Sequence, residues 1–144
     1  KYGEAHMPET HIIPLAMKAA INESEFSLFG TDYDTEDGTC IRDYIHVLDL
    51  VEAHILALEQ LDKTPGEYYY NVGTGIGVSN REVVKEVERV SDLRMNIIES
   101  PRRQGDPDKL IADSTKIKQE LGFFPKYSEI AMIIESAWKW HSKK

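Results

Sequence analysis

A short basic stretch has residue types suited to binding an anion. Residues 102–106, RRQGD, follow Pro101 and contain a glycine, so they are expected on a loop. Two guanidinium groups present planar donors that suit phosphate oxygens, and the Asp106 carboxylate can accept hydrogen bonds from sugar hydroxyls. The stretch predicts either an anion-binding loop or a surface salt bridge.

A second stretch, RDYIHV at residues 42–47, alternates Arg42, Tyr44 and His46 on one face of an expected strand. This pattern is unusual for a strand that serves only the core. If Arg42 and Arg103 converge, they form a clamp for a diphosphate. No GxSxG nucleophile motif is present, and nothing around Cys40 suggests a reactive thiol.

Two other motifs favour structural roles. The spacing of GTGIG, residues 73–77, is GxGxG, whereas a dinucleotide fingerprint needs GxGxxG, so a tight strand-to-helix connection is favoured over cofactor binding. The loop beginning at Asp32 starts like a calcium site, but Asp37 stands where the sharp turn needs glycine. The five histidines show no metal-ligand spacing, so no metal is predicted.

Composition limits the class of protein. The 144 residues predict one domain, 1–144, and the net charge of −8 argues against nucleic acid as a partner. No apolar run approaches the roughly 20 residues that span a bilayer, so no membrane association is expected. One cysteine cannot form an internal disulfide, and the first residues show no signal peptide, so a cytoplasmic location is expected.

Hydrophobic periodicity supplies the elements that must position these residues. It predicts helices at 9–22, with a start or kink at Pro14, and at 47–61. Three further helices are expected: one capped by Ser79 and Glu82, one running from an Asp113 N-cap to about Gly122, and one at 128–141. Strands are predicted at 26–30, 67–72 and 95–99, with an extended segment at 39–46. The class is α/β, and the few short strands fit a smaller lobe rather than a complete doubly wound domain.

Several segments resemble UDP-glucose 4-epimerases of the extended short-chain dehydrogenase superfamily. They are PETHIIP (8–14), the TEDGTCIRDYIHV run (35–47), YNVGTG (70–75) and PRRQGDPDKL (101–110). The GxxGxxG NAD motif and the YxxxK catalytic pair, which the family carries in its N-terminal half, do not occur here. The resemblance therefore implies the C-terminal, UDP-sugar-binding half: a small mixed-sheet lobe with several helices, lacking the N-terminal Rossmann domain.

The resemblance implies an isomerase of galactose metabolism that interconverts UDP-glucose and UDP-galactose through a 4-keto intermediate with NAD. NAD would be bound mainly by the absent half, so no catalytic or cofactor-binding residue is assigned here, and the isolated chain is predicted to be inactive. The parent protein is expected to be a homodimer. The alternatives are a stand-alone, non-catalytic UDP-sugar-binding module and a domain of a related nucleotide-sugar dehydratase or decarboxylase.

The resemblance also implies a set of substrate contacts. Arg42 and Arg103 would bind the diphosphate and Asp106 the ribose. The main chain from Ser27 to Phe29 would meet uracil, while Tyr44 lines the nucleotide pocket. His11 and Ile12 would lie near the phosphate and the sugar. Leu110 would face the hexose and leave room for an N-acetyl group, so UDP-N-acetylhexosamines are also expected as substrates.

Overall fold

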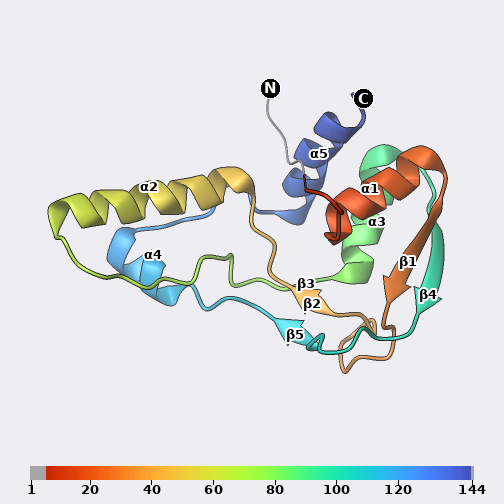
Figure 1. The fold of residues 1–144 in the computed structure, drawn as a ribbon, viewed down its shortest axis with the longest axis horizontal. Helices are drawn as coiled ribbons and strands as arrows, with labels where there is room; N and C mark the ends of the chain where they lie inside the picture. The colour runs from red at the N-terminus through yellow and green to blue at the C-terminus, as the bar shows by residue number, and fades with distance from the viewer. Residues whose placement is uncertain (1–5, 144) are drawn as a thin grey trace.

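Helices and strands alternate along the chain in the computed structural model, which describes residues 6–143 (Figure 1). The elements, in chain order, are α1 (Ile12–Asn22), β1 (Glu25–Phe29), β2 (Ile41–Arg42), α2 (Val47–Lys63), β3 (Val78–Ser79), α3 (Asn80–Ser91), β4 (Asn96–Ser100), β5 (Lys109–Leu110), α4 (Thr115–Leu121) and α5 (Ile130–His141). This order confirms the predicted α/β class with small sheets.

The strands form two separate sheets in the described part of the chain. β1 and β4 pair in parallel, with Phe26 opposite Ile97. β2 is the central strand of the second sheet, antiparallel to β3 and parallel to β5. Each of its ladders is only two residues long, because these three strands are themselves that short. Neither β3 nor β5 was predicted, since two residues carry no periodic signal.

Local sequence signals explain where the helices begin. Pro14 lies in the first turn of α1, where its missing N–H has no acceptor within the helix. The Ser79 hydroxyl accepts from the Glu82 N–H, and the Glu82 carboxylate accepts from the Ser79 N–H, so the predicted capping box is confirmed. The prediction that Asp113 is the N-cap of α4 is wrong by one position. Ser114 occupies that position, but the Asp113 carboxylate accepts from the Thr115 N–H.

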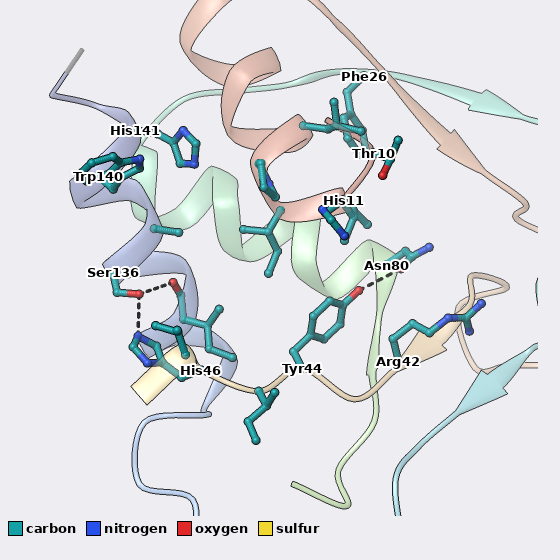
Figure 2. Close-up of a pocket in the computed structure, with 18 of the residues that line it drawn as sticks. Thr10, His11, Phe26, Arg42, Tyr44, His46, Asn80, Ser136, Trp140 and His141 are labelled. Carbon is teal, nitrogen blue, oxygen red and sulfur yellow. Dashed lines mark hydrogen bonds between the residues drawn. The ribbon is translucent and has the colours of Figure 1, made fainter. Parts of the chain in front are cut away.

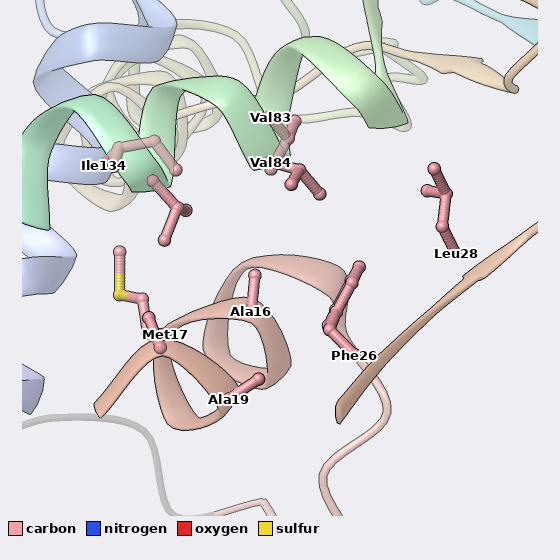
Figure 3. Packing of buried hydrophobic residues seen from close by; sticks show 10 residues of the cluster. Ala16, Met17, Ala19, Phe26, Leu28, Val83, Val84 and Ile134 are labelled. Atoms are coloured by element: carbon pink, nitrogen blue, oxygen red, sulfur yellow. The ribbon is translucent and has the colours of Figure 1, made fainter. Parts of the chain in front are cut away.

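The main core lies where α1, α3 and α5 meet β1 (Figure 3). Ala16 and Met17 of α1 are fully buried against Val83 and Val84 of α3 and Ile134 of α5. Along β1, Phe26 and Leu28 are buried while their neighbours are exposed, which is the alternation of a strand that covers a core on one face. This rigid base supports the end of β1 and the start of α1.

A second, smaller cluster joins α2 to α4. Ala53, Ile117 and Phe123 are buried in it, and Tyr70 and Val72 pack against it. The prediction of a strand at 67–72 is wrong for this structure, which places the segment below α2 without strand pairing (Figure 1). A strand needs a neighbouring backbone to pair with, and the described residues offer none at this position.

One face of α2 remains uncovered. Its apolar residues recur every three or four positions, and Val47, Val51, Ile55 and Leu58 are between 46% and 62% exposed. In Figure 1 this helix extends away from the main core. Between residues 6 and 143, no helix is both long and apolar enough to cross a membrane.

Candidate functional site

A cavity of about 1080 Å³ lies beside the main core (Figure 2). Its walls come from the start of α1, from β1, from the segment between β2 and α2, and from α5. The predicted contact residues that line it are His11, Ile12, Ser27, Phe29, Arg42, Tyr44 and Arg103. Asp106 and Leu110 are not in its lining, although Asp106 contacts two residues that are.

Arg42 and Arg103 come together on the carboxylate of Asp106. Nη2 of Arg42 lies 3.4 Å from Oδ1 of Asp106, and Nε of Arg103 donates to Oδ2 at 3.2 Å. The other terminal nitrogen of Arg42 donates to the carbonyl oxygens of Ile41 and Pro107 at 2.8 and 2.9 Å. These bonds hold the Arg42 guanidinium in place, so its position is fixed before any ligand arrives.

Arg103 is the more exposed of the two, with 55% of its side chain accessible, against 22% for Arg42. Its guanidinium lies 5.3 Å from the centre of the Phe29 ring, at the end of β1. An arginine at this distance from a ring gains a cation–π attraction. The contact links the basic loop to the strand whose main chain is expected to meet uracil.

Arg102, by contrast, makes the surface salt bridge that was one interpretation of the basic pair. Its Nε donates to Oδ1 of Asp32 at 2.7 Å, and a second nitrogen donates to the main-chain oxygen of Asp32. The same guanidinium lies 4.2 Å from the centre of the Tyr33 ring. Arg102 therefore joins the basic loop, residues 102–106, to the acidic loop, residues 32–38, and does not line the cavity.

Tyr44 lies in the middle of the cavity wall (Figure 2). Its hydroxyl donates to Oδ1 of Asn80 at 3.3 Å. Burial raises the pKa of Tyr44 to about 12, because the phenolate would lose its hydration there. The phenol therefore stays protonated at neutral pH and acts as a hydrogen-bond donor, not as a base.

The opposite end of the cavity contains His46 and residues of α5, and of these the sequence analysis singled out only His46. His46 lies at the N-cap of α2, where its Nδ1 accepts from the Leu48 N–H at 3.1 Å. Nδ1 is therefore unprotonated, so Nε2 carries the hydrogen and donates to the Ser136 hydroxyl at 3.0 Å. A cap position was detectable from the onset of periodicity at Val47, but no signal indicated that Ser136, Trp140 and His141 of α5 would also line this cavity.

The glycine-rich loop is engaged with a carboxylate of the chain itself. The main-chain N–H groups of Thr74 and Gly75 donate to Asp43 at 3.0 and 2.9 Å. These are the kind of donors that a dinucleotide loop offers to a pyrophosphate. The arrangement therefore favours the tight connection over cofactor binding at this loop.

The acidic loop also uses its carboxylates internally. Asp37 accepts from the main chain and hydroxyl of Thr39 and from the Ser79 hydroxyl, while Asp32 is paired with Arg102. Asp37 thus joins the acidic loop to the start of α3.

The structure is thus an α/β lobe with two arginines at the edge of a large cavity, and guanidinium groups are donors suited to phosphate oxygens. The chain belongs to the GDP-mannose 4,6 dehydratase family, whose family model matches residues 1–136. It is similar to the UDP-glucose 4-epimerase of Rhizobium meliloti (strain 1021), with 48% identity over all of this chain and 44% of the relative. These findings confirm the resemblance to UDP-glucose 4-epimerases.

Solved structures give the same result. A crystal structure of a UDP-glucose 4-epimerase matches with a TM-score of 0.93 and 48% identity over 99% of this chain and 44% of that one. The Bifidobacterium longum UDP-glucose 4-epimerase, in complex with NAD+ and UDP, matches with a TM-score of 0.86 and 37% identity over 93% of this chain and 40% of that one. The chain thus spans less than half the length of these relatives.

Proposed function

We propose that this chain is the C-terminal UDP-sugar-binding domain of a UDP-glucose 4-epimerase. The observation that carries the proposal is the meeting of Arg42 and Arg103 on Asp106 at the edge of the cavity. Both guanidinium groups offer further donors to a diphosphate, and the pair carries one more positive charge than its carboxylate neutralises. The similarity to epimerases supports UDP-glucose and UDP-galactose as the ligands.

The remaining contacts follow from the walls of the cavity. The main chain of Ser27 to Phe29 holds uracil at the end of β1, and the Asp106 carboxylate accepts from the ribose hydroxyls. Tyr44 donates from the wall, while His11 and Ile12 at the start of α1 lie near the phosphate and sugar. Polar contacts thus gather on the nucleotide, whereas Leu110 offers the hexose only an apolar side chain. Such asymmetry holds UDP tightly and leaves the sugar free to turn between its two orientations.

The described residues do not fit NAD at the one loop that resembles a dinucleotide motif, because Asp43 already occupies its N–H groups. We assign NAD binding, and with it the chemical step, to an N-terminal domain outside these residues. The complete protein then interconverts UDP-glucose and UDP-galactose in the cytoplasm, as part of galactose metabolism, and the isolated chain does not turn over substrate.

The exposed stripe on α2 supports this assignment. Val47, Val51, Ile55 and Leu58 form an apolar face with no cover in the described part of the chain, and the neighbouring segment 67–72 lacks strand pairing. In an α/β layer, such a helix face is covered by neighbouring elements and such an extended segment pairs with a neighbouring strand. Both features are therefore expected where those neighbours belong to another domain. A stand-alone module would need to cover both features by itself.

Calorimetry with UDP distinguishes a domain that needs an N-terminal half for tight binding from a stand-alone UDP-sugar-binding module. One sample is the isolated chain. The other is a chimera in which this chain replaces the segment of the Rhizobium meliloti epimerase with which it aligns. We expect the chimera to bind UDP at least about tenfold more tightly than the isolated chain, a difference of about 1.4 kcal/mol. Equally tight binding by both would favour the stand-alone module.

A further inference from the structure

The carboxylate of Asp43 lies where the central strand of the three-stranded sheet ends. β2 ends at Arg42, and Asp43 follows directly. Its carboxylate accepts four hydrogen bonds, from the Thr74 N–H at 3.0 Å, the Thr74 hydroxyl at 2.6 Å, the Gly75 N–H at 2.9 Å and the Ala112 N–H at 3.3 Å. The donors flank the sheet on both sides, since Thr74 and Gly75 precede β3 and Ala112 follows β5. Asp43 therefore joins all three strands just beyond the last backbone pair.

The ladders that Asp43 extends are short. β2 pairs with β5 only through Ile41 opposite Lys109 and Arg42 opposite Leu110. Two residue pairs specify a register weakly, and a slip of one residue turns every side chain to the other face. A carboxylate bonded to both neighbouring segments resists such a slip, because any shift would break charge-assisted hydrogen bonds.

The packing around Asp43 leaves little freedom for movement. A Cβ atom at Gly73 would lie 2.5 Å from Oδ2 of Asp43 and 2.6 Å from Cβ of Ala112. Only glycine permits this approach without a shift of the loop. The glycine that opens the GTG motif thus allows close contact with a carboxylate of the same chain.

The strand pairing sets the relation between two expected substrate contacts. Arg42, assigned to the diphosphate, is the register partner of Leu110, assigned to the hexose, and Leu110 is 62% exposed. We propose that Asp43 is a positioning residue that holds Leu110 in register with Arg42, and so places the hexose relative to its nucleotide. This inference rests on the proposed function. Asp43 itself contacts no substrate, and it acts through the strands that it joins.

Kinetics of Asp43→Asn in the chimera test the proposal. The amide keeps one acceptor oxygen but turns an NH2 group toward N–H donors, so at least one of the cross-strand bonds is lost. A displacement of about 1 Å near a reacting group can cost about 100-fold in rate. We expect kcat for UDP-galactose to fall by about 10- to 100-fold, while the Kd for UDP, which carries no hexose, changes by less than about twofold.

Asp49→Asn provides a matched control. Like the half-buried Asp43, the buried Asp49 accepts main-chain N–H bonds, from Lys126 and Tyr127 at 2.9 and 2.8 Å, but it joins α2 to the loop before α5. We expect this variant to lower Tm and to leave kcat unchanged at assay temperatures well below Tm. If Asp43→Asn does not fold, Thr74→Val, which removes only the hydroxyl donor, should lower kcat in the same direction by a smaller factor.

The outcomes test the proposed function and the positioning role of Asp43 separately. A parent chimera that folds but does not turn over UDP-galactose would contradict the proposed function. With an active parent, an unchanged kcat in Asp43→Asn, or equal losses in kcat and UDP affinity, would overturn the positioning role. An equal fall of kcat in Asp49→Asn would overturn it as well.

Discussion

Arg42 lies 3.4 Å from Asp106, although the two residues come from strand β2 and from a loop far along the sequence. The second oxygen of the same carboxylate accepts from Arg103. One negative charge therefore holds two positive side chains together beside the cavity. In a chain with a net charge of −8, this arrangement concentrates positive charge where the phosphates are expected.

Replacing Arg103 tests its direct contact with the ligand. In the chimera, Arg103→Ala should raise the Kd for UDP by about 10- to 150-fold, because a hydrogen bond to a charged group contributes about 1.5 to 3 kcal/mol. Arg102→Ala is the control. It removes the same charge, but its guanidinium is paired with Asp32, so we expect less than about a threefold change. Equal losses, measured by calorimetry, would indicate a general effect of net charge.

Leu110 should govern which hexoses fit. Leu110→Tyr adds bulk at the sugar side and should lower kcat/KM for UDP-N-acetylglucosamine by about tenfold or more, with a smaller change for UDP-glucose. Leu110→Met nearly conserves the volume of the side chain, so it should leave the ratio of kcat/KM for UDP-N-acetylglucosamine to kcat/KM for UDP-glucose unchanged. A parent chimera that turns over UDP-glucose but not UDP-N-acetylglucosamine would refute the role of Leu110.

Asp49 should stabilise the fold at neutral pH and lose this effect in acid. Burial disfavours its charged form, but hydrogen bonds from Ser128 and from the N–H groups of Lys126 and Tyr127 outweigh burial and hold its pKa below 3.8. Because the pKa is lower in the folded state, the stabilisation is present above 3.8 and is lost as pH falls through the folded value. Asp49→Asn should therefore destabilise the chain at pH 7 and reduce the dependence of its Tm on pH below about 4.

Thermal unfolding at different pH values can also contradict this role of Asp49. The measurement is Tm as a function of pH for the wild type and for Asp49→Asn, from about pH 2 to about pH 7, a range that includes the ordinary pKa of a carboxyl group. Parallel curves for wild type and Asp49→Asn would show that this carboxylate does not contribute to acid unfolding.

The apolar stripe on α2 should make the isolated chain self-associate. Val51→Gln combined with Leu58→Gln should reduce concentration-dependent association in sedimentation experiments without lowering Tm, because both side chains are about half exposed or more, at 48% and 61%. Ala53→Asp, on the buried face of the same helix, should lower Tm sharply. Unchanged association in the double variant would argue against a docking role for the stripe.

Much of the fold could be predicted because its signals are local. The Ser79 and Glu82 capping box, the apolar period of α2 and the short run that became β1 each depend on neighbouring residues. The expected strand at 67–72 is different, since aromatic residues favour a strand but only a partner strand makes one. β2 lies within the extended segment predicted at 39–46, whereas β3 and β5 escaped prediction because two-residue strands are created by tertiary contacts.

The candidate site could likewise be predicted only in part. Arg42 and Arg103 could be proposed from their residue types, but their meeting on Asp106 depends on how β2 and the basic loop are folded together. The difference between Arg102 and Arg103 was not predictable, because adjacent arginines in one loop carry no signal of which one Asp32 will bind. The lining contributed by α5 depends on helix packing alone.

The most direct test of the central claim is turnover of UDP-galactose by the chimera with this chain in place of the aligned segment. We predict that the chimera forms UDP-glucose, that Arg42→Ala in the chimera weakens UDP binding, and that the isolated chain supplied with NAD forms no product. A chimera that folds and retains NAD but leaves UDP-galactose unchanged would contradict the proposal.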